Sequence, residues 1–349
     1  MAVYCFGCLL SMLMTSIVVR IKHKRTGWSY KLTISFFASL PLMLIAAFRY
    51  YVGQDYAAYI RLFKQAVNGY RQPGMEIPFH ELNRLVYRLG GDYTWIFAIC
   101  AILFCIFVYL QIYEDSPYPW LSVFLVVTAL YYFAFFNTMR QLVGCAILLY
   151  SIRYIKQRDP LRFGLCVAFA CCFHYACVLF VPMYFIYGKI ISRKAIVITT
   201  IGVFILATPL SRLILQIASW TSYAHYIGGA FDSTERGYTT LVMSIVQVLF
   251  ATVYYDSEDE NYVFYYNLQL IALWLTAFVG KVVLISRIRW IFGLPSIILL
   301  PMVLCKVKRK NDRIIITAIM VILYSIYFYY TIGINNSANV LPYQTIFNR

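Results

Sequence analysis

Long apolar runs, each of a length that can cross a bilayer, constrain this chain more than any other feature of its sequence. Hydrophobic residues make up 62% of its 349 residues, and charged residues only 13%. A helix needs about 20 apolar residues to cross a bilayer, and lipid-facing backbone must satisfy its own hydrogen bonds. A membrane β-barrel would need short alternating strands, whereas these runs are continuously apolar. The sequence therefore predicts an all-α, polytopic integral membrane protein with a single transmembrane domain over residues 1–349.

The number of spans follows from the positions of the runs. Residues 163–187 form a run that is long for one span and short for two, with Arg162 before it and Lys189 after it. Because both basic flanks should face the same side, we expect a hairpin of two short helices that meet near His174. The total is about 12 helices (roughly 11–13), with both termini outside. The other predicted spans are Val3–Val19, Leu32–Phe48, Tyr93–Ile112, Trp120–Phe136, Met139–Ile155, Ile196–Leu215, Thr240–Tyr255, Phe264–Gly280, Trp290–Leu304 and Ile314–Thr331.

Lysine and arginine are distributed differently over the two predicted faces. The predicted cytoplasmic loops hold nine lysines and eight arginines, whereas the outer side holds Lys64, Lys281 and eleven arginines. Lysine thus follows the positive-inside rule and arginine departs from it. The planar arginine fork suits phosphate, so the excess predicts an anionic, phosphate-bearing substrate on the outer face. Single arginines such as Arg84 can instead extend to lipid headgroups. The net charge of +16 lies at span ends, and no nucleic acid is predicted as a partner.

Two outer loops are expected to be the longest. The loop at about residues 49–92 is amphipathic and predicted to lie on the outer leaflet. The loop at about 216–239 contains His225 and Asp232. The inner loops are shorter, and the acidic run 256–260 is interpreted as a solvated connector rather than a metal site. We therefore expect the function to face outward.

The first candidate site residues lie where the second span ends. Arg49 and Asp55 flank Gly53, and Tyr56 follows at once. Glycine permits a tight turn or a close backbone approach. Arg49 could bind phosphate and Asp55 could accept a proton from a sugar hydroxyl; the alternative is a salt bridge that holds the loop. Charged residues kept near a membrane core usually bind or react, which favours the functional interpretation.

Further candidates lie at the outer ends of other spans. Arg140 and Gln141 open a span, where free N–H groups and the helix dipole favour an anion. His174 lies at the proposed hairpin turn and could serve as a general base or as a donor to phosphate, although a lone histidine in an apolar run is usually structural. Glu76 offers a second carboxylate. Arg287 and Arg289 precede a span two residues apart, so they point to different helix faces. Zinc-ligand spacing, Walker and dinucleotide fingerprints are absent from the sequence, which predicts neither metal nor cofactor.

Several short motifs appear one after another along nearly the whole chain. They are Arg49-x-x-Val-Gly-x-Asp55-Tyr56-x-x-Tyr59, Glu76-x-Pro78-Phe, Phe136-Asn-x-x-Arg140-Gln141, Phe173-His174-Tyr, Arg287 with Arg289, and Pro342-Tyr343. In these residues the chain resembles the EpsG-type branch of bacterial polysaccharide polymerases and is similar to Wzy O-antigen polymerases. The family pattern often joins Glu to Pro, whereas Ile77 stands between them here.

The resemblance implies a metal-independent glycosyltransferase related to the GT-C class, in the bacterial cytoplasmic (inner) membrane. Its implied substrate is an undecaprenyl-diphosphate-linked oligosaccharide repeat on the outer face, joined into O-antigen, capsule or exopolysaccharide. A chain-length regulator and a flippase are the implied protein partners. We expect Asp55, then His174 and Glu76, as candidates for the base. Arg49, Arg140, Gln141, Arg287, Arg289, Tyr56 and Tyr343 are expected to bind diphosphate or sugar.

Two other functions stay open at this point. A flippase or transporter of the same lipid-linked sugars predicts a charged cavity near the bilayer midplane and internal repeats. A membrane O-acyltransferase predicts an acyl-donor site near the inner face, where this chain has plain lysine-rich connectors.

Overall fold

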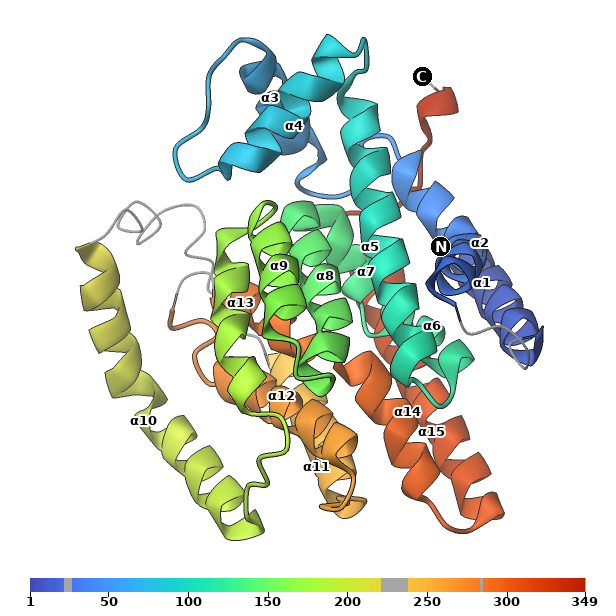
Figure 1. Cartoon of the computed structure of the whole chain (residues 1–349), viewed down its shortest axis with the longest axis vertical. Coiled ribbons are helices and arrows are strands. Elements are labelled where there is room, and N and C mark those ends of the chain that lie inside the picture. The colour runs from blue at the N-terminus through green and yellow to red at the C-terminus, as the bar shows by residue number, and fades with distance from the viewer. Residues whose placement is uncertain (22–26, 221–237, 283–284, 349) are drawn as a thin grey trace. The chain divides into compact units, whose positions relative to one another are not determined.

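The structure is a computed structural model that describes residues 1–21, 27–220, 238–282 and 285–348 (Figure 1). Helices account for 78% of the described residues, which contain no strand beyond an isolated bridge between Arg49 and Thr345. The all-α prediction is confirmed. Long apolar segments form helices because a helix satisfies every backbone group within one segment.

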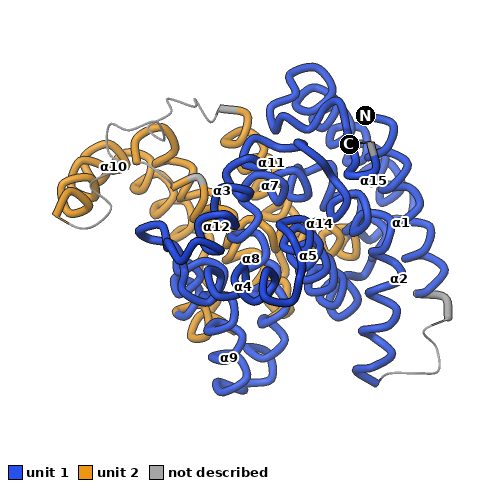
Figure 2. Tube along the Cα trace, turned by 90° about the horizontal axis from the view of Figure 1, so that it is seen from above, with its two compact units in different colours: residues 1–181, 307–349 blue, residues 182–306 orange. Residues whose placement is uncertain are grey.

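Two units can be distinguished, one of residues 1–181 and 307–349 and the other of residues 182–306 (Figure 2). The single transmembrane domain stays a prediction. The first unit contains α1 (Ala2–Ile21), α2 (Trp28–Ala47), α3 (Tyr56–Val67), α4 (Ile77–Arg88), α5 (Tyr93–Asp115), α6 (Pro119–Thr128), α7 (Tyr131–Asn137), α8 (Met139–Lys156), α9 (Pro160–Cys171), α15 (Lys310–Phe328), η4 (Tyr329–Ile334) and η5 (Ile346–Asn348), and η2 (Tyr175–Phe185) continues into the second. The second unit contains α10 (Arg193–Ser219), α11 (Tyr238–Val253), α12 (Glu260–Thr276), α13 (Ile285–Gly293) and α14 (Ser296–Lys306).

In the first unit, α5 lies between α2 and α8, and α9 packs on α8 (Figure 1). Lys31 near the start of α2 pairs with Glu114 at the end of α5 at 2.6 Å, so these two helices run antiparallel. Lys156 at the end of α8 pairs with Asp115, also at the end of α5. One end of the unit therefore carries lysine–carboxylate pairs. The other end is where α5 and α8 begin and where α2 and α9 finish.

The short helices α3 and α4 pack on each other and on α5, beside the beginning of that helix (Figure 1). Each has one buried face, which includes Tyr56, Tyr59 and Phe63 on α3 and Phe79 and Val86 on α4. The predicted loop at 49–92 is thus largely helical. Its amphipathic character follows from one face that packs on the unit and one that stays exposed.

The second unit is built around α12, which contacts α10, α11, α13 and α14. Its acidic connector lies before α12, where Lys306 binds Asp256 and Asp259, each at 2.8 Å. The carboxylates therefore form ion pairs with a lysine. His225 and Asp232, which lie in the predicted outer loop at about 216–239, fall outside the described residues.

The predicted count of about 12 spans is not confirmed. Helices occur at the predicted positions, but among the described residues five are long and apolar enough to cross a membrane: Trp28–Ala47, Tyr93–Asp115, Arg193–Ser219, Arg287–Lys306 and Lys310–Ile334. A sixth arises if α6 and α7, bent by 47° at a break, form one span. The backbone of Leu130 at this break has a φ of 69°, which ends α6. Other apolar helices are shorter, among them α9 and η2, which flank His174 as predicted. The GT-C-like fold stays a prediction.

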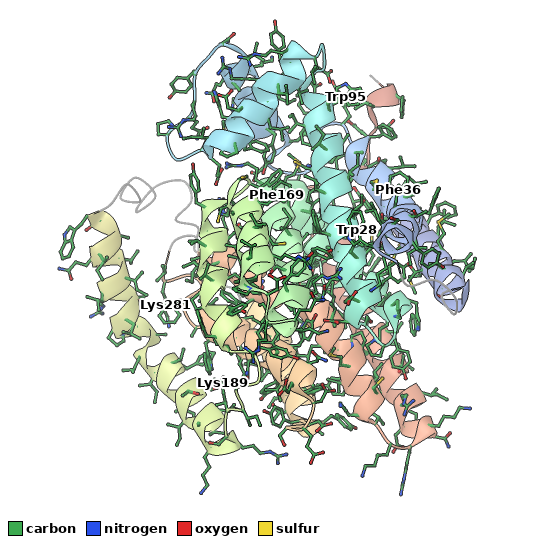
Figure 3. The ribbon with its side chains drawn as sticks, viewed as in Figure 1. Trp28, Phe36, Trp95, Phe169, Lys189 and Lys281 are labelled. Carbon is green, nitrogen blue, oxygen red and sulfur yellow. The ribbon has the colours of Figure 1, made fainter. Side chains whose placement is uncertain are left out.

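Exposed aromatic side chains mark both ends of the antiparallel pair α2 and α5 (Figure 3). Trp28 begins α2 and Trp95 lies in the first turn of α5, and their exposed fractions are 57% and 61%. Phe36 is exposed between them along α2. Indoles at both ends of an apolar surface are typical of membrane–water interfaces. Together with the apolar helices, this pattern identifies a multi-pass membrane protein.

Candidate functional site

Arg49 lies just after α2, and its side chain is buried, with 1% of the residue exposed. Its Nη1 donates hydrogen bonds to the carbonyls of Phe136 (2.7 Å) and Val52 (3.3 Å). The guanidinium carbon lies 4.4 Å from the ring centroid of Phe136 and 4.9 Å from that of Phe97. Burial lowers the pKa of Arg49 to about 10, which leaves it charged at neutral pH. Arg49 therefore ties its loop to the end of α7 as a buried cation among aromatic rings.

A segment near the C-terminus, residues 336–346, holds the same loop from the other side; we call it the C-terminal strap. The strap accepts hydrogen bonds from the backbone N–H groups of Tyr50 (at the Gln344 carbonyl, 2.9 Å) and Gly53 (at the Asn339 carbonyl, 2.8 Å). The hydroxyl of Tyr343 donates to the carbonyl of Ile45 at 2.9 Å. Backbone far apart in sequence thus encloses residues 49–55, and Tyr343 acts here as a structural anchor.

Asn137 joins three segments at this point. Its Oδ1 accepts a hydrogen bond from the Gln54 N–H at 2.8 Å, and its Nδ2 donates to the Ala338 carbonyl at 3.2 Å. Gly53 makes room for this junction: its φ is +101°, and an added Cβ would lie 2.9 Å from Asn137 Oδ1. The sequence predicts no role for Asn137, which stands inside a motif, because an isolated amide carries no signal of its distant partners.

Glu76, Arg140 and His174 form an ionic cluster at the same end of the first unit. The Glu76 carboxylate lies before α4 and is 2% exposed. Its Oε1 accepts two hydrogen bonds, one from Nδ1 of His174 at 3.0 Å and one from the Tyr175 N–H at 3.2 Å. The other oxygen accepts from Nη1 of Arg140. Arg140 and His174 follow Glu76 by 64 and 98 residues in the sequence. Three distant segments of the chain therefore meet at this carboxylate.

The charge state of Glu76 decides which nitrogen of His174 carries the proton. Burial alone would raise the pKa of Glu76, but the hydrogen bond from His174 and the charge of Arg140 outweigh it and hold the pKa below its ordinary value of 4.5. An ionised carboxylate can only accept, so Nδ1 of His174 must be the donor. In neutral His174, Nε2 then bears the lone pair. A carboxylate that orients a histidine in this way prepares a general base.

A family model described as the EpsG family matches residues 32–345. The chain belongs to the EpsG family. The match includes every residue of the ionic cluster and of the Arg49 loop. No curated protein and no solved structure has a significant match to the chain. EpsG membership indicates a glycosyltransferase-like role in polysaccharide polymerisation.

Arg140 is the partly exposed cation of the ionic cluster in this EpsG protein. It lies in the first turn of α8, and its side chain is 24% exposed. Its Nη1 donates a hydrogen bond to the Glu76 carboxylate, whereas its Nε is buried and has no hydrogen-bond partner in the described part of the chain. The hydroxyl of Tyr59 accepts a hydrogen bond from the backbone N–H of Arg140 at 3.4 Å and donates one to the Asn137 carbonyl. These contacts link the cluster to the Arg49 loop.

The other predicted residues have different surroundings in the EpsG protein. Tyr56 is 1% exposed and stacks on Phe97 with ring centroids 4.5 Å apart, so it packs the loop. Gln141 is buried on α8, and Asp55 is partly exposed before α3. Arg287 and Arg289 lie on α13 in the second unit, and their role at the same site stays a prediction.

The described residues contain no group of three or more His, Cys, Asp or Glu side chains arranged to hold a metal. The cluster of the EpsG protein combines one carboxylate, one imidazole and one guanidinium instead. Such a set can remove a proton from a hydroxyl and stabilise negative charge on an adjacent leaving group.

Proposed function

We propose that this EpsG protein joins undecaprenyl-diphosphate-linked oligosaccharide repeats on the outer face of the bacterial cytoplasmic membrane. The observation that carries the proposal is the meeting of Glu76, Arg140 and His174 at one end of the first unit. The opposite end carries the lysine pairs of Lys31 and Lys156, the residue type that marks the cytoplasmic side. The ionic cluster then faces outward, where lipid-linked repeats present a diphosphate and sugar hydroxyls.

In the proposed reaction, a hydroxyl of the acceptor repeat attacks the anomeric carbon of the donor chain. A new glycosidic C–O bond forms, the C–O bond to the diphosphate breaks, and undecaprenyl diphosphate leaves with the bonding electrons. Nε2 of His174 takes the hydroxyl proton, and Glu76 holds the imidazole in the tautomer that can do so. The sequence placed Asp55 first as the base; the geometry favours His174, because its Nδ1 is bound to a buried carboxylate.

Arg140 is proposed to bind the leaving diphosphate. A guanidinium donates hydrogen bonds in a fork that matches phosphate oxygens, and negative charge grows on them as the bond breaks. Arg49 is proposed to act indirectly, since its hydrogen bonds to the carbonyls of Val52 and Phe136 hold the loop against the end of α7. Because a diphosphate is already a good leaving group and Arg140 supplies positive charge, the proposed reaction needs no metal and no cofactor.

Two alternatives predict different behaviour. A flippase would bind the same lipid and move it across the bilayer without new glycosidic bonds. An O-acyltransferase would modify the glycan with an acyl group. The polymerase is favoured by family membership and by the carboxylate–imidazole pair, which is the arrangement of a base rather than of a passive binding site.

The test uses purified full-length protein and the lipid-linked repeat extracted from cells in which this gene is deleted, with EDTA and without nucleotide-sugar. The expected product is a ladder of multiples of the repeat. Arg140→Ala should abolish the ladder and Arg140→Lys should restore part of it, because lysine keeps the charge without the fork. Arg84→Ala is the matched control, since Arg84 lies on α4 in a partly exposed pair with Glu81.

Movement of the lipid across liposomes without a ladder would establish the flippase instead. An acylated, unpolymerised repeat after addition of an acyl donor would establish the acyltransferase. Normal product from Arg140→Ala in a working assay would remove Arg140 from the mechanism while leaving the polymerase intact.

A further inference from the structure

Tyr51 has a backbone conformation that its side chain disfavours. Its φ is +50°, in the left-handed region that glycine adopts readily and bulky residues adopt rarely. The same turn places a glycine two residues later, at φ +101°. A strained tyrosine persists only where its surroundings hold it, and such positions gather at functional sites.

The ring of Tyr51 is exposed, although the residues around it are not. Its exposed fraction is 57%, whereas the neighbouring Val52 is 1% exposed. The ring centroid lies 4.8 Å from that of Tyr50, edge-on, and 5.2 Å from that of Tyr56. Tyr56 in turn stacks on Phe97 at 4.5 Å. The aromatic ring is therefore supported from within the protein and open on another side.

The loop beneath the ring is held at both ends. The Tyr50 N–H is bound by the C-terminal strap, and the Val52 carbonyl accepts a hydrogen bond from buried Arg49. A side chain with so little freedom loses little entropy when a ligand packs on it. These contacts make a fixed aromatic surface rather than a mobile one.

The ring also lies on a short path to the ionic cluster. Tyr56, which touches Tyr51, is one turn from Tyr59 on α3, and both contact Phe97. The Tyr59 hydroxyl accepts a hydrogen bond from the Arg140 N–H. Tyr51 therefore belongs to the same end of the first unit as Glu76 and His174.

We propose that Tyr51 is a sugar-binding platform on which a pyranose ring of the lipid-linked repeat stacks. This inference rests on the proposed function and adds a residue that recognises the glycan. The C–H face of a pyranose is apolar, and the face of an aromatic ring is electron-rich, so the two surfaces attract. Tyr56 and Tyr343 were the tyrosines predicted to bind diphosphate or sugar, and burial makes Tyr56 the support of the platform.

The competing explanation is that Tyr51 contacts lipid headgroups, as tyrosines do at membrane surfaces. Tyr70 is a matched control for that explanation, because it is 54% exposed on the same outer segment and has a negative φ. A lipid-contact role would make the two tyrosines respond alike. A sugar platform would make only Tyr51 affect the repeat.

The experiment compares Tyr51→Phe, Tyr51→Leu, Tyr51→Gly and Tyr70→Leu in detergent, with the lipid-linked repeat from cells that lack this gene. Tyr51→Phe keeps KM within about two-fold, since the ring remains. Tyr51→Leu and Tyr51→Gly raise KM roughly three- to ten-fold with kcat little changed. Tyr51→Gly also melts about 2 °C higher, because glycine tolerates the left-handed backbone.

An unchanged KM in Tyr51→Leu would refute the sugar platform. A rise in the KM of Tyr70→Leu equal to that of Tyr51→Leu would refute it too. A second measurement keeps this inference separate from the polymerase itself. In saturation-transfer NMR, the oligosaccharide released from the lipid by mild acid should contact the wild type more than Tyr51→Leu. If the wild type makes no ladder yet shows this difference, the proposed function fails and the platform stands; equal transfer to both proteins refutes the platform.

Discussion

Replacing Glu76 with glutamine tests the proposed base most directly, because the two side chains have the same shape. The carboxylate accepts three hydrogen bonds, from His174, the Tyr175 N–H and Arg140. A glutamine offers one oxygen and one NH2 group. In a first orientation, the amide oxygen stays toward His174 and the NH2 group faces the Arg140 donor. In a second orientation, the amide oxygen turns to Arg140 and the NH2 group faces Nδ1 of His174.

The second orientation is expected, since an amide oxygen gains most beside a charged guanidinium. His174 must then accept at Nδ1 and carry its proton on Nε2, which removes the lone pair that takes the acceptor proton. General-base catalysis contributes about 10²–10⁴-fold, so kcat should fall by roughly that factor. The folded state should lose about 1–3 kcal/mol, because the Tyr175 N–H then faces the amide NH2 group and loses its acceptor.

The assay is the initial rate of ladder formation by purified protein, with thermal unfolding measured on the same samples. Glu81→Gln is the control, because Glu81 is 48% exposed on α4 and pairs with Arg84. The double variant Glu76→Gln with His174→Gln should be no slower than either single variant, since both remove one base. A Glu76→Gln protein with more than about a tenth of the wild-type rate would refute the Glu76–His174 base.

Three further predictions concern stability and the Arg49 loop. Gly53→Ala should lower the free energy of unfolding by about 1–3 kcal/mol, because its Cβ would meet Asn137 Oδ1 at 2.9 Å and φ is +101°; Gly90→Ala, at φ +82° with nothing within 4 Å of its Cβ, should lose less in the same denaturation experiment. Asn137→Ala should remain folded yet melt lower and polymerise more slowly, because Gln54 and Ala338 lose their partner; wild-type rate and melting temperature would contradict that. Because the pKa of Glu76 is lowered in the folded state, its ionisation stabilises the protein above pH 4.5, and this contribution should disappear as pH falls through the folded pKa. The melting temperatures of wild type and Glu76→Gln should therefore converge in acid, and a constant difference would show that the Glu76 charge is not the cause.

Local patterns sufficed to predict which parts of the chain are helical and which residues deserve attention. Apolar runs of the right length predicted helices at their observed places, and the charge of Arg162 and Lys189 predicted the two short helices around His174. The predicted count of about 12 spans is not confirmed, because several of those helices are shorter than a bilayer needs. Length and hydropathy are properties of one segment, so a sequence can report them alone.

The partners of Glu76 were decided only by the tertiary structure. Its carboxylate meets Arg140 and His174 because α8 begins and α9 ends at the same level of the first unit, which depends on how α5, α8 and α9 pack. The same packing buries Arg49 under the C-terminal strap and leaves Tyr51 exposed. A side chain's hydrogen-bond partners and solvent exposure depend on contacts between segments far apart in sequence, and a linear pattern of residue types does not contain them.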